Sequence, residues 1–349
     1  MYQRAVRAPN LQELFLQPRV QLDGTQDPCT GAAPAASAAA CALTGVTAAE
    51  YGNIAKNPAG QYNGLAGGNV SLAPEKADTY TVGLVFTPKF LPDFNATIDY
   101  YNITIKNLIS TYGANLILST CLASADPFYC GKVHRTQGTG TVADGSLWIN
   151  TDGFIADTDF NLGSQRANGV DVTSQYRLDF GGAGRLGVDF VGTYVLKNAT
   201  EPVTGLGSYD CAGYYGPICG VPTPRWKQKL RATWNTPLSG LDVYTAWRRA
   251  NGVATERTNP SPLIQNLPLP ALAVPGARLR GVDYIDLGGS YTFAGHVTAR
   301  LGINNVFDKS PPIGPQTPYG SPVFTNGNIY PQVYDALGRY AFFNLIVDF

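Results

Sequence analysis

The sequence has 349 residues, enough for one large β domain or two ordinary domains. Charged residues make up only 14% of it, well below the usual quarter in soluble proteins, and 25 Lys and Arg balance 25 Asp and Glu. Without a net charge there is no overall field to attract nucleic acid, so we expect no DNA or RNA partner. No run approaches the roughly 20 apolar residues of a membrane-spanning helix, and the N-terminus lacks the apolar stretch of a signal peptide.

Apolar and polar residues alternate with a period of two through most of the chain, which predicts β-strands. We predict about ten strands of roughly 8–13 residues, the length that a tilted membrane-spanning strand needs. In chain order they are Tyr2–Val6, Thr79–Thr87, Asn95–Leu108, Gly169–Phe180, Arg185–Lys197, Arg225–Asn235, Leu241–Trp247, Ile285–Phe293, Val297–Phe307 and Gly338–Phe349. The strand at Asn95–Leu108 is irregular, because its apolar positions change phase at Tyr100 and Tyr101.

The strand at Arg225–Asn235 carries three basic residues, Lys227, Lys229 and Arg231, on one face only. On a face exposed to lipid each would cost about 2–4 kcal/mol near the middle of the bilayer, so they indicate a water-filled interior. A one-sided antiparallel sheet of a soluble protein alternates in the same way, so alternation alone leaves both classes open.

The connections between the predicted strands alternate between short and long. The short ones contain Gly, Pro, Asn or Asp; they are Thr87–Asp93, Gly181–Gly184, Asn235–Gly240 and Ala294–His296. The long ones are Arg7–Asp78, Asn107–Asn168, Asn198–Pro224, Asn251–Gly281 and Asp308–Arg339. Long extracellular loops and short periplasmic turns are typical of outer-membrane barrels, and a soluble sandwich has no reason to sort its loops by length. Aromatic residues near the strand ends suit the two membrane interfaces; they are Tyr100, Tyr101, Trp226, Trp234, Trp247 and Tyr340.

The C-terminal strand is apolar at every second position and ends in an aromatic residue. These positions are Ala341, Phe343, Leu345, Val347 and Phe349. A terminal strand of this kind is the pattern that outer-membrane barrels present to the barrel assembly machinery. An ordinary last strand can end in the same way.

The six cysteines fall in three pairs that are close in sequence: Cys29 and Cys41, Cys121 and Cys130, Cys211 and Cys219. None has the spacing of a zinc or redox motif, and neither histidine lies where it would complete a metal site. Because all six lie in the long connections, we expect three loop disulfides and an oxidising compartment. Six free thiols in a cytosolic protein are the alternative.

The residues predict no catalytic constellation, no metal site and no cofactor. Asp152, Asp157 and Asp159 lie close together, but their spacing fits no EF-hand loop, so we expect solvated loop acids. Contacts to a small extracellular ligand should come from aromatic residues of the long loops. The candidates are Tyr62, Phe128, Tyr129, Trp148, Tyr209, Tyr214, Tyr215, Tyr319 and Tyr334. Packing of the loops against one another is the alternative role of each.

Six segments, in this order, resemble conserved segments of the TonB-dependent receptor family. They are RAVRAPNLQELF (Arg4–Phe15), SLAPEKADTYTVGLVF (Ser71–Phe86), IDYYNITIKNLI (Ile98–Ile109), NGVDVTSQY (Asn168–Tyr176), ARLGINNVFDKSPP (Ala299–Pro312) and GRYAFFNLIVDF (Gly338–Phe349). Each motif is weak alone, but their order and spacing extend over nearly the whole chain. In the fourth segment Asp171 stands where the family has Glu.

The resemblance implies an all-β fold: an antiparallel up-and-down transmembrane β-barrel, here partial, with residues 1–349 forming about ten C-terminal strands. It implies that the plug domain, the TonB box and the N-terminal strands of the family's 22-stranded barrel are absent from this chain. It also implies uptake of a scarce ligand across the Gram-negative outer membrane, such as a siderophore–iron complex, a cobalamin or a carbohydrate, driven by the TonB–ExbB–ExbD complex.

Several alternatives stay open beside this interpretation. We expect that the chain alone does not transport, and that its two open edges make it aggregate or close imperfectly. A porin-like or structural outer-membrane barrel without energy coupling is the second hypothesis. A secreted soluble β enzyme is the third, and no cluster of titratable residues outside the loops supports it.

Overall fold

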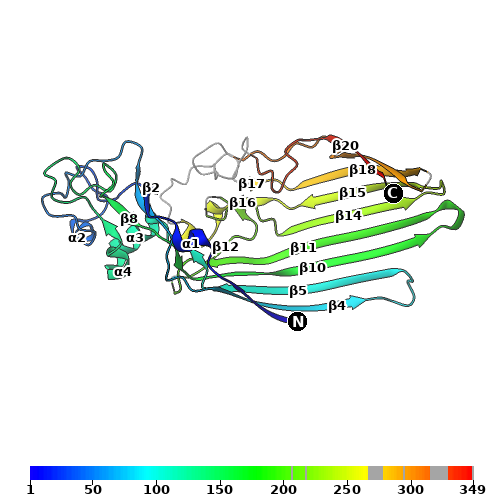
Figure 1. Ribbon diagram of the computed structural model, residues 1–349, viewed down its shortest axis with the longest axis horizontal. Helices are drawn as coiled ribbons and strands as arrows, with labels where there is room; N and C mark the ends of the chain where they lie inside the picture. Colours follow the sequence, from blue (N-terminus) through cyan, green and yellow to red (C-terminus); the bar gives the residue numbers. More distant parts are fainter. Residues whose placement is uncertain (206, 217, 266–277, 294, 315–328, 348–349) are drawn as a thin grey trace.

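The computed structural model describes residues 1–205, 207–216, 218–265, 278–293, 295–314 and 329–347. Ten long strands form one antiparallel sheet in which each strand pairs with the neighbours that precede and follow it in this set (Figure 1). They are β1 (Tyr2–Arg7), β4 (Glu75–Phe86), β5 (Phe94–Lys106), β10 (Ser164–Asp179), β11 (Arg185–Glu201), β14 (Trp226–Asn235), β15 (Leu241–Ala250), β18 (Val282–Phe293), β19 (Val297–Asn304) and β20 (Tyr340–Val347). The predicted number and order of strands are confirmed.

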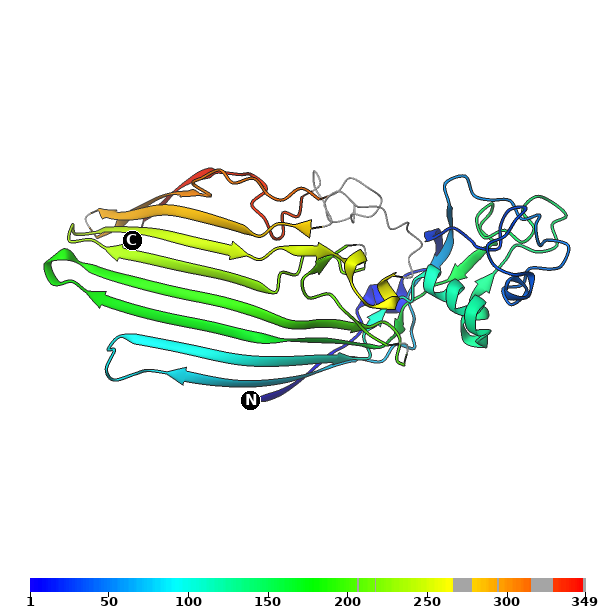
Figure 2. The ribbon, with the colours of Figure 1, turned by 180° about the vertical axis from the view of Figure 1, so that it is seen from behind.

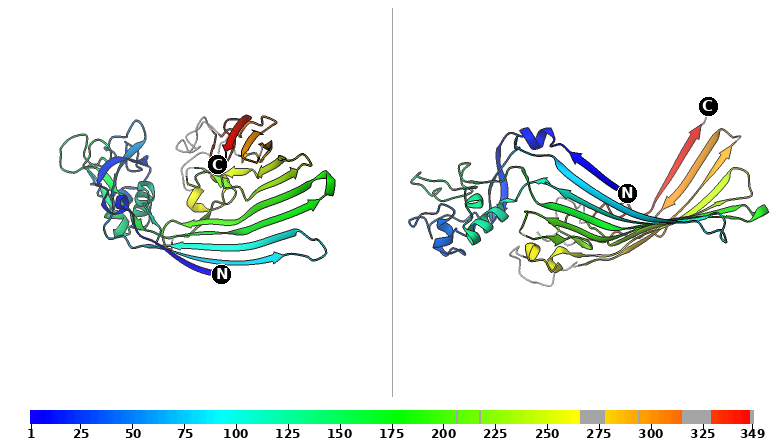
Figure 3. Two further views of the ribbon diagram at one scale, coloured as in Figure 1. Left: turned by 45° about the vertical axis from the view of Figure 1, so that its right-hand side comes forward. Right: turned by 90° about the horizontal axis from the view of Figure 1, so that it is seen from below.

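The sheet is strongly curved but not closed. Its edges are β1 and β20, which do not pair with each other and lie apart (Figure 3). The architecture is therefore that of a partial barrel, as predicted. Seen from either side, the short turns lie at one end of the strands and the long connections at the other (Figures 1 and 2).

The short turns depend on residues that tolerate a left-handed backbone. Gly184, which ends the turn between β10 and β11, has a φ of 92°. A Cβ atom at this position would lie 2.2 Å from the carbonyl oxygen of Asn235 on the neighbouring strand β14. Only glycine therefore fits both the backbone conformation and the close approach.

The apolar positions of β5 change phase at Tyr100 and Tyr101 as predicted, but the strand itself has no bulge there. Strand β5 pairs with β10 without a shift in register, so Tyr100 lies on one face and Ile103 and Ile105 on the other. The irregularity lies in β10 instead, where a bulge between Asn168 and Gly169 shifts the pairing with β11. Beyond Tyr100, toward the long connections, β5 carries the polar residues Asn102, Thr104 and Lys106 on the face of Tyr100. Its apolar residues there lie on the opposite face.

The register aligns the apolar positions of the strands on one side, which we call the apolar face. It includes Tyr80, Val82, Leu84, Phe86, Ile98, Tyr100, Val170, Val172, Tyr194, Leu230, Trp247, Ile285, Leu301 and Phe343. Many of these side chains are exposed: Leu84 is 74% and Phe343 64% accessible. A continuous exposed surface of this kind is stable when lipid covers it. The opposite side, the polar face, carries Asp99, Asp171, Arg177, Lys229 and Arg300.

Aromatic side chains mark both ends of the apolar face. Near the short turns Phe86, Phe94 and Tyr176 contact one another across three strands. Toward the long connections lie Tyr80, Tyr100, Tyr194, Trp226 and Trp247. Of the residues predicted for this role, Tyr101 and Tyr340 lie instead on the polar face, because they pair with Gly169 and Asn304.

The last strand continues the apolar face. Ala341, Phe343, Leu345 and Val347 pair with Ile303, Leu301, Ala299 and Val297 of β19. The final predicted residue, Phe349, lies outside the described residues. Recognition of this strand by the assembly machinery stays a prediction.

The long connections contain short elements of their own. The helices are α1 (Leu11–Phe15), α2 (Ala38–Ala42), α3 (Ala114–Ser124), α4 (Pro127–Cys130) and α5 (Pro262–Gln265), with 3₁₀ turns at Gly181–Ala183 and Glu256–Thr258. The short strands are β2 (Arg19–Thr25), β3 (Gln61–Ala66), β6 (Ile109–Ser110), β7 (Val133–His134), β8 (Phe154–Ala156), β9 (Phe160–Asn161), β12 (Tyr209–Asp210), β13 (Tyr214–Tyr215), β16 (Val253–Thr255) and β17 (Arg278–Leu279). No helix in the described ranges is long and apolar enough to cross a membrane.

Two adjacent residues of β10 test the assignment of the faces. Val172 lies on the apolar face and pairs with Ile98, whereas Thr173 lies on the polar face. We expect Val172→Arg to destabilise the barrel by about 2–4 kcal/mol in urea titrations in lipid vesicles, because a charge near the bilayer centre is poorly solvated. Thr173→Arg, the matched control, should have a much smaller effect. Equal effects of the two variants would contradict the assignment.

Candidate functional site

A cavity of about 520 Å³ lies on the polar face near the long connections. Two rows of paired residues form its floor, because the register places them side by side on β11, β14, β15 and β18. They are Thr193, Lys227, Ala250 and Val282 in one row, and Val191, Lys229, Arg248 and Tyr284 in the other. The predicted position of Lys227 and Lys229 on a polar face is confirmed, but the sequence did not predict the cavity.

Residues 329–338, which precede β20, cover one side of this cavity. Asp335 forms an ion pair with Arg248 at 2.6 Å, and Arg248 also pairs with Asp286 at 2.7 Å. The backbone N–H of Asp335 donates to the hydroxyl of Tyr284. Gln332 and Val333 of the same segment line the cavity. This segment is therefore held against the polar face by a partly buried charge network.

The free positive charge in the cavity comes from its two lysines. The guanidinium of Arg248 is fully engaged by two carboxylates. Within the described residues neither Lys227 nor Lys229 has an ion-pair partner. The cavity can therefore attract a ligand with negative charge, since the lysine ammonium groups can donate charge-assisted hydrogen bonds to it.

The first two long connections, residues 8–74 and 107–163, fold together into one unit, which we call the loop lobe (Figure 1, left). Strands from both connections form its sheet, in the order β2-β3-β8-β7. Its core contains Tyr62, Ala114, Ile117, Leu118, Cys121, Tyr129, Val133, Leu147 and Ile155. Disulfides join Cys29 to Cys41 and Cys121 to Cys130 within this lobe, and Cys211 to Cys219 in the third long connection. The three pairs are those expected from the sequence.

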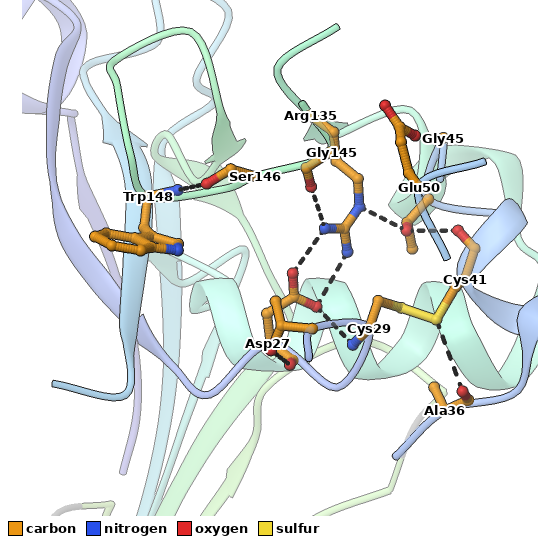
Figure 4. Close-up of polar contacts among 12 residues, drawn as sticks. Asp27, Cys29, Ala36, Cys41, Gly45, Glu50, Arg135, Gly145, Ser146 and Trp148 are labelled. Atoms are coloured by element: carbon orange, nitrogen blue, oxygen red, sulfur yellow. Dashed lines mark hydrogen bonds and ion pairs between the residues drawn. A yellow bond between two sulfur atoms is a disulfide. The ribbon is translucent and has the colours of Figure 1, made fainter. Parts of the chain in front are cut away.

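A buried ion pair joins the two halves of the loop lobe (Figure 4). Arg135 donates from both terminal nitrogens to Asp27, at 2.6 and 3.1 Å, and from Nε to the hydroxyl of Thr44 at 2.9 Å. The carbonyl of Gly145 accepts a further bond from Arg135. Asp27 also accepts from the N–H of Cys29, so the ion pair is linked to the disulfide. Sequence analysis gave no signal for this pair, because 108 residues separate its members.

We expect Arg135→Leu to destabilise the loop lobe by about 3–5 kcal/mol, because it leaves the Asp27 carboxylate buried without a partner. Limited proteolysis of the loops measures this effect. Arg185→Leu removes an exposed ion pair to Asp179 and serves as the control, with no measurable change expected. A protease-resistant lobe in the Arg135 variant would contradict the role of the pair.

The expectation of solvated loop acids is wrong for Asp157, which is buried, 2% accessible. Its carboxylate accepts hydrogen bonds from the N–H groups of Tyr112 and Gly113, at the start of α3. Burial, and next the negative charge of Asp23, raise the pKa of Asp157 to about 6. Burial also raises the pKa of Asp23, which hydrogen-bonds to Asp157. The two carboxyls therefore share a proton at mildly acidic pH.

This pair should make the stability of the loop lobe depend on pH. The folded lobe holds the Asp157 proton more tightly than the unfolded chain, where the ordinary value is 3.8. The stabilisation is therefore complete below pH 3.8 and is lost as the pH rises through about 6, a total of roughly 3 kcal/mol. Asp157→Asn should remove most of this dependence and leave only the part due to the buried Asp23, as measured by hydrogen exchange of α3 across a pH series. Asp152→Asn, at an exposed position, should retain it.

The structure places several predicted ligand-contact aromatics in the loop cores. Tyr62, Tyr129, Tyr215 and Tyr334 are all at most 6% accessible and pack the loops together, which is the alternative role left open by the sequence. Ligand contact by these residues stays a prediction. Another predicted contact residue, Trp148, is partly buried and donates from its indole nitrogen to the carbonyl of Ala55.

The remaining aromatics keep some exposed surface or are not described. Phe128 is 47% accessible but packs against Tyr112, and the Lys132 ammonium lies 4.9 Å from its ring centre. Tyr209 and Tyr214 are partly exposed and stay predictions. Tyr319 lies outside the described residues.

A buried acid that the sequence did not predict organises the third and fourth long connections. Glu256 is 1% accessible and accepts hydrogen bonds from the N–H groups of Ile218 and Cys219. It thereby joins the 3₁₀ turn at Glu256–Thr258 to the Cys211–Cys219 loop. Among the described residues no three His, Cys, Asp or Glu side chains are grouped so that they could hold a metal ion.

The exposed apolar face, the polar opposite face and the sorted loops define the chain as part of the wall of a membrane-spanning β-barrel. The family model described as "TonB dependent receptor-like, beta-barrel" matches residues 2–306. The chain belongs to this family, which consists of receptor and transport barrels of the Gram-negative outer membrane and not of enzymes.

Solved structures agree with this fold. A single-residue mutant of the ferric enterobactin receptor from Pseudomonas aeruginosa aligns with a TM-score of 0.57 at 15% identity, over 100% of this chain and 37% of that one. The siderophore receptor from Acinetobacter baumannii gives a TM-score of 0.53 at 15% identity, over 100% and 38% of the two chains. The chain thus spans less than two fifths of the length of these structures. No curated protein matches the sequence significantly.

Proposed function

We propose that these ten strands are the C-terminal part of a longer receptor that takes up a siderophore–iron complex of net negative charge. The cavity with Lys227 and Lys229 carries this proposal, because the two lysines lack anionic partners within the described residues and line the polar side of the wall. The printed names of the similar structures, receptors for ferric enterobactin and for a siderophore, support the ligand class.

In this function, the strands supply a wall and the long connections supply the extracellular entrance. An anionic complex that enters from outside reaches the lysines at the upper end of β14, beside the segment held by Asp335. The charges attract the ligand and the cavity retains it. The TonB–ExbB–ExbD complex would supply the energy for release, through N-terminal parts of the receptor that lie outside this chain.

Two iron complexes of different charge test the ligand class. A ferric tris-catecholate carries net negative charge, because three dianionic catecholates outweigh one Fe³⁺, whereas a ferric tris-hydroxamate is neutral. We expect Lys227→Gln/Lys229→Gln to weaken binding of the tris-catecholate by at least about tenfold, measured by fluorescence quenching on the intact receptor. Binding of the tris-hydroxamate should change little in the same variant.

Lys89→Gln, in the short turn between β4 and β5, is a control that keeps the cavity intact. An unchanged affinity of the double variant for the tris-catecholate would contradict the role of the cavity. A separate assay tests energy coupling: deletion of TonB should abolish uptake of the iron complex but not its binding. A porin-like barrel would continue to transport.

A further inference from the structure

Four basic residues lie on the apolar face, which is the outer face of the sheet, at the end near the long connections. This outer basic patch consists of Lys76 on β4, Lys106 on β5, Arg166 on β10 and Lys197 on β11. The register puts the first three on the same face as Tyr80 and Tyr100, and Lys197 beside Asn168 on that face. All four side chains are exposed.

The patch contains a cross-strand pair of like charges. Lys76 on β4 is the direct partner of Lys106 on β5. Direct partners have Cβ atoms about 5 Å apart, so two lysines at these positions repel each other and destabilise the sheet. Within the described residues neither lysine forms an ion pair, and the side chain of Arg166 bonds only to the amide oxygen of Asn102.

The acids nearest to the patch are engaged elsewhere. Asp78, on the same face, accepts from Arg4 and from the hydroxyl of Tyr2. Glu201 accepts from Ser164 and from the N–H of Gly205. The charge of Asp78 also acts on Lys106, but Asp78 is shared with Arg4, so the four basic residues of the patch keep a surplus of positive charge.

The position of the patch along the membrane normal indicates which layer of the membrane it faces, the hydrocarbon or the lipid headgroups. Lys76 lies four residues from Tyr80 along β4, which is roughly 13 Å along the strand and about 10 Å along the membrane normal after the strand tilt. Tyrosine rings lie at the boundary between hydrocarbon and headgroups. A lysine side chain that reaches back toward this boundary places its ammonium group among the lipid headgroups.

We propose that the outer basic patch binds the phosphate groups of outer-leaflet lipid headgroups. A phosphate between Lys76 and Lys106 replaces their mutual repulsion by two attractive contacts, and Arg166 offers further N–H donors to the same headgroup. The occupant is a lipid because the patch continues the lipid-covered apolar face and points away from the polar face. This inference does not depend on the ligand proposed for the cavity.

Lipid A, whose headgroup carries phosphate monoesters, is a suitable probe. The receptor isolated from the outer membrane in detergent is titrated with lipid A, and binding is followed by native mass spectrometry. We expect Lys76→Gln/Lys106→Gln to weaken binding by about 30-fold, since each lysine near an anionic surface contributes a factor of about five. Lys227→Gln/Lys229→Gln removes the same charge from the polar face and should leave lipid A binding unchanged.

Dephosphorylated lipid A should bind the unaltered receptor as weakly as phosphorylated lipid A binds the Lys76/Lys106 variant. This measurement keeps the proposal testable if that variant fails to fold. Three outcomes would overturn the proposal: unchanged binding by the Lys76/Lys106 variant, an equal loss in the Lys227/Lys229 control, or equal binding of the two forms of lipid A. Binding of inorganic phosphate with the same affinity as lipid A would also overturn the proposal, because the site would then recognise a free anion.

Discussion

The backbone hydrogen bonds between neighbouring strands are the constraint on which the rest of the structure depends. Hydrocarbon offers no partner for an N–H or C=O group, so each spanning strand must pair along its whole length. Pairing of consecutive strands sets the register, and the register decides which side chains share a face. Lys229 lies beside Arg248, and Lys76 beside Lys106, for this reason and not because the side chains attract each other.

Most of each long connection takes no part in this pairing of the spanning strands, so other interactions must stabilise it. The long connections extend beyond the ends of the strands, where no membrane confines them. The loop lobe therefore has its own apolar core, two disulfides and the buried pair of Asp27 and Arg135. These features join two connections that are distant in sequence into one unit. Asp335 and Arg248 hold residues 329–338 against the wall in a comparable way.

The two faces use their charges differently. On the polar face some charges pair across strands, as Arg177 does with Asp189, whereas the lysines of the cavity form no ion pair among the described residues. On the outer face the charges lie toward the long connections, where water and headgroups can solvate them. On the described strands of the sheet, lysines without an ion pair therefore form two groups, one facing the interior and one facing the membrane surface.

The amino-acid pattern by itself determined the ten strands, their order, the two faces and the three disulfide pairs, because period-two alternation and cysteine spacing are local properties. It also placed Lys227 and Lys229 on the polar face. Only the tertiary structure decided that residues 329–338 form one side of the cavity, that Arg135 pairs with Asp27, and that Asp157 is buried beside Asp23. It also put Tyr62, Tyr129, Tyr215 and Tyr334 inside the loops. These features depend on contacts between segments distant in sequence, and no local pattern records which loop will cover which residue.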